Sequence, residues 1–361
     1  MKPRYLAALF LTLLSSHPLL AQRPLTVTEA ERVLAPLVEA YGVSGAEGPV
    51  RDLVRSLLPS WAHAETDTAG NLRVTVGHGD PLVVFVAHLD ELGFRVTAIR
   101  DNGQLELEPR GGFFTSLYEA EPALVHTAVG IVPGVFTPRD SLPTRHNPSA
   151  LRVDVGTASR AATEALGIAV GTSITMPKRY TRLAGTKATG RAFDDRVGCA
   201  ALLLALRRLD PARLHHAVMF VWSVREEIGL EGAKVVADEL GSKPARVHAI
   251  DTFVSSDAPL DPKGYALAPL GKGPVIRALD NSAAAPPALV DSLRALARAQ
   301  RIPLQYGTTS GGNDGSTFLP YGVPDVAIGW PLRYSHSPAE TIDLRDLVHL
   351  AEVVEIITKR W

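Results

Sequence analysis

The chain has a single cysteine, Cys199, among its 361 residues, so it can form no internal disulfide and no zinc site built from thiolates. Long runs of basic residues are also absent: 37 Lys and Arg stand against 38 Asp and Glu, for a formal net charge of -1. Because phosphate binding needs clustered basic side chains, this composition excludes a nucleic-acid partner. Any metal ion would have to be bound by histidine and carboxylate side chains.

The N-terminal apolar run is too short to span a membrane, which needs about 20 apolar residues. This run, residues 6–14, follows Lys2 and Arg4 and precedes small and polar residues that end at Ala21. The pattern predicts a signal peptide over 1–21, cleaved after Ala21, and therefore a periplasmic or secreted protein with no stable membrane span. An N-terminal anchor or an amphipathic arm is the alternative interpretation.

Two different residue patterns divide the remainder of the chain. In residues 22–94 and 188–361, apolar strand patterns alternate with helical patterns, which predicts an α/β domain with a mixed sheet sandwiched by helices. Residues 95–187 have short alternating stretches, frequent Gly and Pro, and turn signals such as Asn102-Gly103, so we predict a small inserted β-rich domain there. The predicted helices cover residues 26–42, 47–58, 159–166, 195–209, 229–240 and 343–359, and the predicted strands cover 72–76, 82–87, 217–223, 246–250, 274–279, 305–309 and 325–330.

Polar residues of metal-binding type follow several of the apolar strands. In open α/β sheets, ligands bind beyond the carboxyl ends of the strands, so residues far apart in sequence can meet in one crevice. Buried carboxylates and histidines are costly unless they are paired or bound to metal. The residues at these strand ends are His88, Asp90 and Glu91, then Glu226 and Glu227, then Asp251, and finally His336.

Each of these features also has a simple structural explanation. His88 and Asp90 could cap the end of a strand, and the pair Asp194-Asp195 could begin a helix. Glu226-Glu227 could be an exposed helical turn. Asp251 could be a turn residue, and His336 could be a surface histidine. The order of the motifs and the residues that flank them favour the functional interpretation.

The sequence resembles the M42 family of metallo-aminopeptidases over nearly all of the part that follows residue 21. Five motifs in the same order carry this resemblance. They are His88-Leu89-Asp90-Glu91-Leu92-Gly93-Phe94; Phe193-Asp194-Asp195-Arg196; Glu226-Glu227-Ile228-Gly229-Leu230-x-Gly232-Ala233 with Ile250-Asp251; Ser310-Gly311-Gly312-Asn313-Asp314; and Tyr334-Ser335-His336-Ser337-Pro338-x-Glu340.

The resemblance implies a zinc-exopeptidase-like fold and a particular set of site residues. One metal would be bound by His88 and Asp251 and the other by Glu227 and His336, while Asp194 would bridge the two. Glu226 would be the general base, and Asp90 would orient His88. The segment 95–187 would match the family's PDZ-like β-barrel, which mediates oligomerisation, so a homo-oligomer from a dimer to a dodecamer is expected. Asn313 departs from the family pattern, which has Thr there, in a loop on the substrate side.

The chemistry of these residues agrees with such a site. Two divalent ions can polarise a peptide carbonyl and activate a water, and His and carboxylate ligands leave open coordination positions. A histidine ligand needs an acceptor that fixes its tautomer, and Asp90 is close enough in sequence to provide one. Zinc is the expected metal, with cobalt as the alternative.

We therefore expect a metal-dependent aminopeptidase that removes N-terminal residues from peptides. A related two-metal carboxypeptidase or N-acyl amino acid deacylase is an alternative with the same ligand set. A non-catalytic ligand-binding protein on the same fold is another, although the presence of all five ligands and the general base argues against it.

Overall fold

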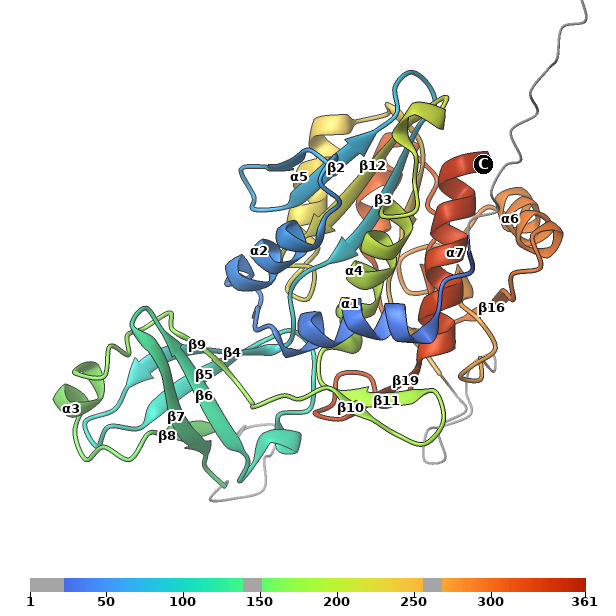
Figure 1. Ribbon diagram of the computed structural model, residues 1–361. Helices are drawn as coiled ribbons and strands as arrows, with labels where there is room; N and C mark the ends of the chain where they lie inside the picture. Colours follow the sequence, from blue (N-terminus) through green and yellow to red (C-terminus); the bar gives the residue numbers. More distant parts are fainter. Residues whose placement is uncertain (1–22, 139–150, 256–267) are drawn as a thin grey trace, which may run out of the picture.

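A five-stranded mixed sheet forms the centre of the molecule (Figure 1). The computed structural model describes residues 23–138, 151–255 and 268–361. The predicted signal peptide, residues 1–21, lies outside them. The strand order is β1 (Ala64–Thr66), β2 (Leu72–Val76), β12 (Ala217–Ser223), β3 (Leu82–His88) and β13 (Pro244–Ala249). Strands β12, β3 and β13 are parallel, and β1 and β2 are antiparallel to their neighbours, so the predicted mixed sheet is confirmed.

Helices cover both faces of this sheet. Successive residues of β3 point to opposite faces, so each set of side chains packs against different helices. Val83 and Phe85 belong to the large core under α1, α2, α4 and α7, whereas Val84 and Val86 pack with α5. This explains why the strand is continuously apolar in sequence. The helices are α1 (Val27–Glu39), α2 (Gly48–Leu57), α4 (Phe193–Leu206), α5 (Glu231–Leu240), α6 (Pro287–Ala299) and α7 (Leu344–Arg360).

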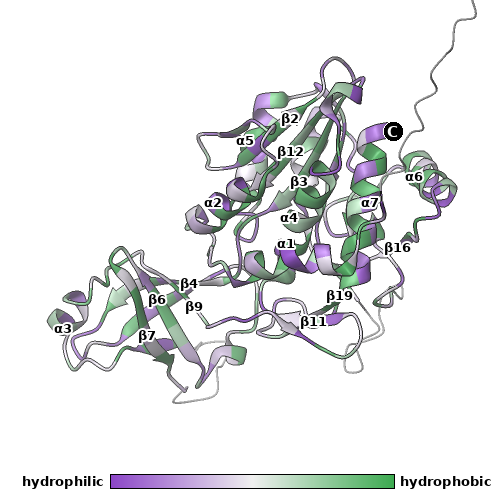
Figure 2. Ribbon diagram, viewed as in Figure 1, coloured by the Kyte–Doolittle hydropathy of each residue, from purple (hydrophilic) through white to green (hydrophobic). Residues whose placement is uncertain are grey.

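The local sequence explains where the helices begin and which side they bury. The predicted capping box at the start of α1 is present, with the side chain of Thr26 accepting from the amide of Glu29 and the Glu29 side chain accepting from the amide of Thr26. Helix α4 is buried along its whole length, since it packs against β3, α1 and α7. Helix α7 is amphipathic, and both colours of the hydropathy scale alternate along it (Figure 2). Helix α6 and its apolar face were not predicted.

Three smaller sheets extend the α/β part toward the loops that carry the candidate site. Their strands are β10 (Thr181–Arg182), β11 (Lys187–Gly190) and β19 (Glu340–Asp343); β14 (Phe253–Val254) and β18 (Pro331–Leu332); and β16 (Gln305–Thr308), β15 (Val275–Leu279) and β17 (Ile328–Gly329). Short 3-10 helices lie at Thr115–Tyr118, Pro211–Arg213 and Asp314–Tyr321. No helix in the described ranges is long and apolar enough to cross a membrane.

A closed six-stranded barrel lies to one side of the α/β part (Figure 1). It has its own core, in which the ring of Phe94 lies 5.1 Å from those of Tyr118 and Phe136. A separate core is expected of a separately folding unit. The strands in barrel order are β4 (Gly93–Ile99), β5 (Leu105–Arg110), β8 (Arg152–Asp154), β7 (Gly130–Phe136), β6 (Pro122–Thr127) and β9 (Ser173–Thr175), with helix α3 (Arg160–Glu164) beside them. The likeness to PDZ domains stays a prediction.

The chain enters and leaves the barrel at neighbouring points. Strands β4 and β9 pair antiparallel, with Phe94 opposite Ile174. The segment after β9 returns to the α/β part: Lys178 donates to the carbonyl of Ala40 at 2.6 Å, and β11 pairs with β19. The barrel therefore spans roughly 93–175, and the last residues of the predicted insertion, 178–187, contact the α/β part.

Excising residues 95–173 and joining the ends through a short Gly-Ser linker should leave a folded α/β unit, because Phe94 and Ile174 are already paired. Circular dichroism and thermal unfolding would measure this. If the barrel carries the contacts between subunits, light scattering should also show fewer subunits in each particle. An excised protein that is soluble but has no cooperative unfolding transition would contradict the division into an α/β unit and an inserted barrel.

Candidate metal centre

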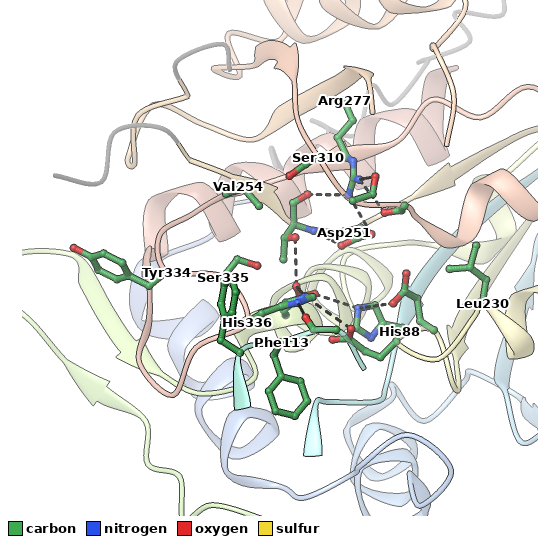
Figure 3. A pocket seen from close by; sticks show the side chains of 18 residues that line it. His88, Phe113, Leu230, Asp251, Val254, Arg277, Ser310, Tyr334, Ser335 and His336 are labelled. Atoms are coloured by element: carbon green, nitrogen blue, oxygen red, sulfur yellow. Dashed lines mark hydrogen bonds and ion pairs between the residues drawn. The ribbon is translucent and has the colours of Figure 1, made fainter. Parts of the chain in front are cut away.

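The parallel strands bring the predicted ligands to one edge of the sheet. His88 ends β3 and lies opposite Ser223, the last residue of β12, so Glu226 and Glu227 follow at the same edge. Asp251 follows β13, whose Ala249 lies opposite Val86. A cavity of about 600 Å³ opens there, lined by the five predicted ligands and the predicted base, and Figure 3 labels His88, Asp251 and His336 among its lining residues. The ligands and the base are His88, Asp194, Glu226, Glu227, Asp251 and His336.

The carboxylate of Asp194 lies between two imidazoles. Its Oδ1 is 3.1 Å from Nε2 of His88, and its Oδ2 is 3.4 Å from Nε2 of His336. Burial alone would raise the pKa of Asp194, but the hydrogen bonds with His336 and His88 hold it well below its usual range. One carboxylate with a different imidazole at each oxygen has the arrangement of a bridging ligand.

Glu227 provides the clearest sign that a cation belongs here. Its Oε2 lies 3.7 Å from Nε2 of His336, while its Oε1 is buried and accepts no hydrogen bond within the described part of the chain. Burial and the nearby charge of Asp194 raise the pKa of Glu227 to about 7. Potential ligand atoms of His88, Asp194 and Glu227 lie within 4.8 Å of one another. A divalent cation would satisfy the unpaired oxygen, so this donor set fits a metal ion.

Asp251 lies in the same cavity and has a cationic partner of its own. Its Oδ2 is 3.1 Å from Nη1 of Arg277, and its other oxygen accepts from the amide of Thr252. Burial raises the pKa of Asp251, as does the charge of Asp194, while Arg277 opposes that rise. The next residue, Thr252, donates from its hydroxyl to Oδ2 of Asp194 at 3.4 Å, so Asp251 lies beside Asp194 while its own side chain is paired with Arg277.

Asp90 is completely buried and connects two of the motifs. It accepts hydrogen bonds from the hydroxyl of Ser44 at 2.6 Å and from the amides of Glu226 and Glu227 at 3.0 and 3.2 Å. Its carboxylate is 3.5 Å from Nδ1 of His88, and its backbone carbonyl is closer to the same nitrogen, at 3.1 Å. Asp90 thus positions the Glu226-Glu227 turn as well as the imidazole of His88.

Glu226 has the environment of a strong base. Its carboxylate lines the cavity, with Oε2 3.9 Å from Nε2 of His88. Burial raises its pKa well above the usual range, and the charges of Asp251 and Glu227 add to the effect. A carboxylate with a raised pKa takes up a proton more readily near neutral pH.

Two site residues were not assigned a role from the sequence. Glu340, the first residue of β19, accepts from the amides of His336 at 3.0 Å and Asp194 at 3.3 Å. It thereby holds a turn in which both Tyr334 and His336 have positive φ, a conformation that costs free energy in non-glycine residues. Arg277 was hidden inside an apolar strand pattern. Glu340 could have been found, since it ends the His336 motif.

The comparisons with known proteins show which family the chain belongs to. The family model described as M42 glutamyl aminopeptidase matches residues 70–353. The putative aminopeptidase FrvX of Escherichia coli K12 is 31% identical over 89% of this chain and 93% of its own length. The lysyl aminopeptidase of Pyrococcus furiosus is 31% identical over 86% of this chain and 91% of its own length.

Solved structures give the same result. The TET1 peptidase of Pyrococcus horikoshii, described as able to assemble into a tetrahedron or a large octahedral shell, is 32% identical with a TM-score of 0.83, and the match covers 93% of this chain and all of that one. The PhTET1-12s structure, a dodecamer, is 31% identical with the same TM-score and the same coverage. The chain therefore belongs to the M42 family of aminopeptidases and is a peptide hydrolase.

The predicted periplasmic or secreted location is wrong. The relatives and structures that match are aminopeptidases and TET-type aminopeptidase complexes, and nothing in these matches indicates secretion. The prediction rested on Lys2 and Arg4, a short apolar run and a possible cleavage site at Ala21, which are short local patterns.

Replacing Asp90 with Asn should lower the affinity for divalent metal by about 10–100-fold, because it removes the charge near Nδ1 of His88 and weakens the acceptor for two backbone amides. Competition with a chromophoric chelator would measure the affinity. Ser44→Ala is the control, since it removes one hydrogen bond to the same carboxylate and leaves its charge, and it should have a smaller effect. Equal affinities for Asp90→Asn and the parent would contradict the role of Asp90.

Proposed function

We propose that this chain is a metal-dependent aminopeptidase that removes N-terminal residues from peptides with two divalent ions in its site. The observation that carries the proposal is the carboxylate of Asp194, which has one oxygen toward His88 and the other toward His336. We assign His88 and Asp251 to one ion, Glu227 and His336 to the other, and Asp194 to both. The unpaired oxygen of Glu227 and membership of the M42 family support this assignment.

When bound, the ions would polarise the scissile carbonyl and lower the pKa of the attacking water. The residues of the chain would do the remaining work. Glu226 would take the proton of the water and deliver it to the leaving amine, and its carboxylate lines the cavity where that water would lie. Asp90 and Glu340 would hold the ligands in place through the backbone amides that they accept from.

We also propose that the chain acts as a homo-oligomer and that the barrel takes part in its subunit contacts. The TET1 structures, which are tetrahedral, octahedral or dodecameric, support the first statement. The second comes from the resemblance to the M42 family, and the barrel's separate core and its position beside the α/β part agree with it. The barrel also reaches the cavity, since Gly112, Phe113 and Phe114 line it and the carbonyl of Gly112 lies 2.6 Å from Nδ1 of His336.

Glu226→Gln should retain both ions and lose most of the activity, because Gln keeps the size of Glu and removes the basic oxygen. Loss of a general base costs about 10²–10⁴ in rate. Turnover on an aminoacyl anilide and elemental analysis would measure the two effects. Glu227→Gln is the matched control one residue away, and it should lose metal. A metal-free Glu226→Gln protein would mean that the two roles are exchanged.

Removing metal with a chelator should abolish activity and lower the temperature of thermal unfolding, because ions bound to the folded state stabilise it. Adding back zinc or cobalt should restore both, and their relative turnover would identify the better metal.

An N-acetylated copy of the best peptide should resist cleavage, since an aminopeptidase needs a free N-terminus. Cleavage of the acetylated peptide would favour the carboxypeptidase or deacylase alternative, and full activity after chelation would contradict metal dependence.

A further inference from the structure

Arg277 is a buried cation inside the candidate site. It lies in β15, its side chain is only 1% exposed, and it lines the same cavity as the predicted ligands (Figure 3). A buried guanidinium is costly unless its charge and its N–H groups are paired. Its partners therefore indicate what it does.

Every nitrogen of the Arg277 guanidinium has a partner, since the group donates four hydrogen bonds and forms an ion pair with Asp251. Its Nε donates to Asp280 at 2.9 Å, and its Nη1 faces both the carboxylate of Asp251 at 3.1 Å and the carbonyl of Thr252 at 2.9 Å. Its Nη2 donates to the carbonyls of Gly311 at 3.2 Å and Gly312 at 2.8 Å. Because all three nitrogens are engaged in this way, the guanidinium cannot bind a substrate carboxylate without giving up one of these contacts.

The partners of Arg277 belong to two different parts of the site. Asp251, with Thr252 beside it, follows β13 and is assigned to a metal ion. Gly311 and Gly312 belong to the glycine-rich loop, which has no side chains there to hold it and whose Gly311 has a φ of +91°. One planar guanidinium thus fixes a predicted metal ligand and two consecutive carbonyls of the loop across the cavity.

Asp280 extends this connection along the loop. The same oxygen that accepts from Arg277 also accepts from the amide side chain of Asn313 at 2.9 Å. Its other oxygen accepts from the amides of Ser282 and Ala283 at 2.8 and 3.1 Å. Asn313, which departs from the family pattern, is therefore part of the same network.

We propose that Arg277 is a positioning residue that couples the orientation of Asp251 to the shape of the 310–312 loop on the substrate side of the cavity. The proposal rests on the assignment of Asp251 as a metal ligand under the proposed function. With Oδ2 of Asp251 fixed by Arg277, the carboxylate is restricted in how it can turn toward an ion. Because Nη2 holds the carbonyls of Gly311 and Gly312, the loop has its conformation before the substrate binds. Lysine has neither the planar geometry nor the five donors needed to do both.

Arg277→Lys tests both halves of the proposal. We expect metal affinity to fall by about 10–100-fold, as when a group that orients a ligand is lost. We also expect KM for an aminoacyl anilide to rise at saturating metal, because the loop loses its anchor. Arg345→Lys is the matched control: Arg345 contacts Asp343 through two nitrogens and does not line the cavity, so both values should stay at the parental level.

Asp280→Asn provides a second variant that leaves the pair of Arg277 and Asp251 in place. It should raise KM with a smaller change in metal affinity, since it weakens the loop side of the network. If Arg277→Lys does not fold, Asp280→Asn decides, and a parental KM in that variant would overturn the proposal. A merely structural role predicts a lower unfolding temperature of the metal-free protein with parental metal affinity and KM, and that result in Arg277→Lys would also overturn it.

The parent protein separates this proposal from the proposed function. If the parent binds two ions and needs them, the proposed function holds, and the variants test Arg277 alone. If the parent needs no metal, the proposed function fails. The KM values of Arg277→Lys and Asp280→Asn then still test the coupling to the loop, with a rise in both supporting that half and parental values overturning it.

Discussion

The pairing of one buried carboxylate with two imidazoles is the interaction on which the site depends. Burying the carboxylate of Asp194 costs free energy, and its charge is tolerated because His88 and His336 face its two oxygens. His88 comes from the central strand β3 and His336 from a turn before β19, so this contact joins the beginning and the end of the α/β part. The acceptors around it, Asp90 and Glu340, fix the backbone on either side.

A second buried charge cluster attaches the barrel to this site. Glu91 lies next to Asp90 and is paired with Lys178 at 2.7 Å, Arg191 at 3.1 Å and Arg196 at 3.6 Å. Burial alone would raise the pKa of Glu91, but these three cations hold it at about 2. Lys178 belongs to the segment that returns from the barrel, and Glu91 belongs to the His88 motif. Their ion pair therefore fixes the end of the barrel segment against that motif. Breaking one partner of such a cluster leaves the others buried and uncompensated.

Much of the fold could be predicted from local patterns, and the failures have physical reasons. The run 82–87 predicted a strand buried on both faces, and the texture after Gly93 predicted an inserted β unit. Strand ends predicted where His88 and Asp251 would lie, because parallel strands share one carboxyl edge. Local patterns could not show that His336 meets Asp194, since a turn far along the chain makes that contact. The five partners of Arg277 are likewise a product of tertiary structure, and none of them lies on its own strand, which ends at Leu279. The export prediction failed because composition near an N-terminus does not distinguish a signal peptide from an arm.

The most direct test of the central claim is the metal content of Asp194→Asn compared with the parent, measured by elemental analysis after equilibration with zinc at a fixed free concentration. Asn keeps the size of the side chain and loses the charge and one of the two ligand oxygens. The account predicts two ions per chain in the parent and the loss of both at zinc concentrations that saturate the parent, because the same carboxylate serves both. Two ions bound to Asp194→Asn with parental affinity would contradict it.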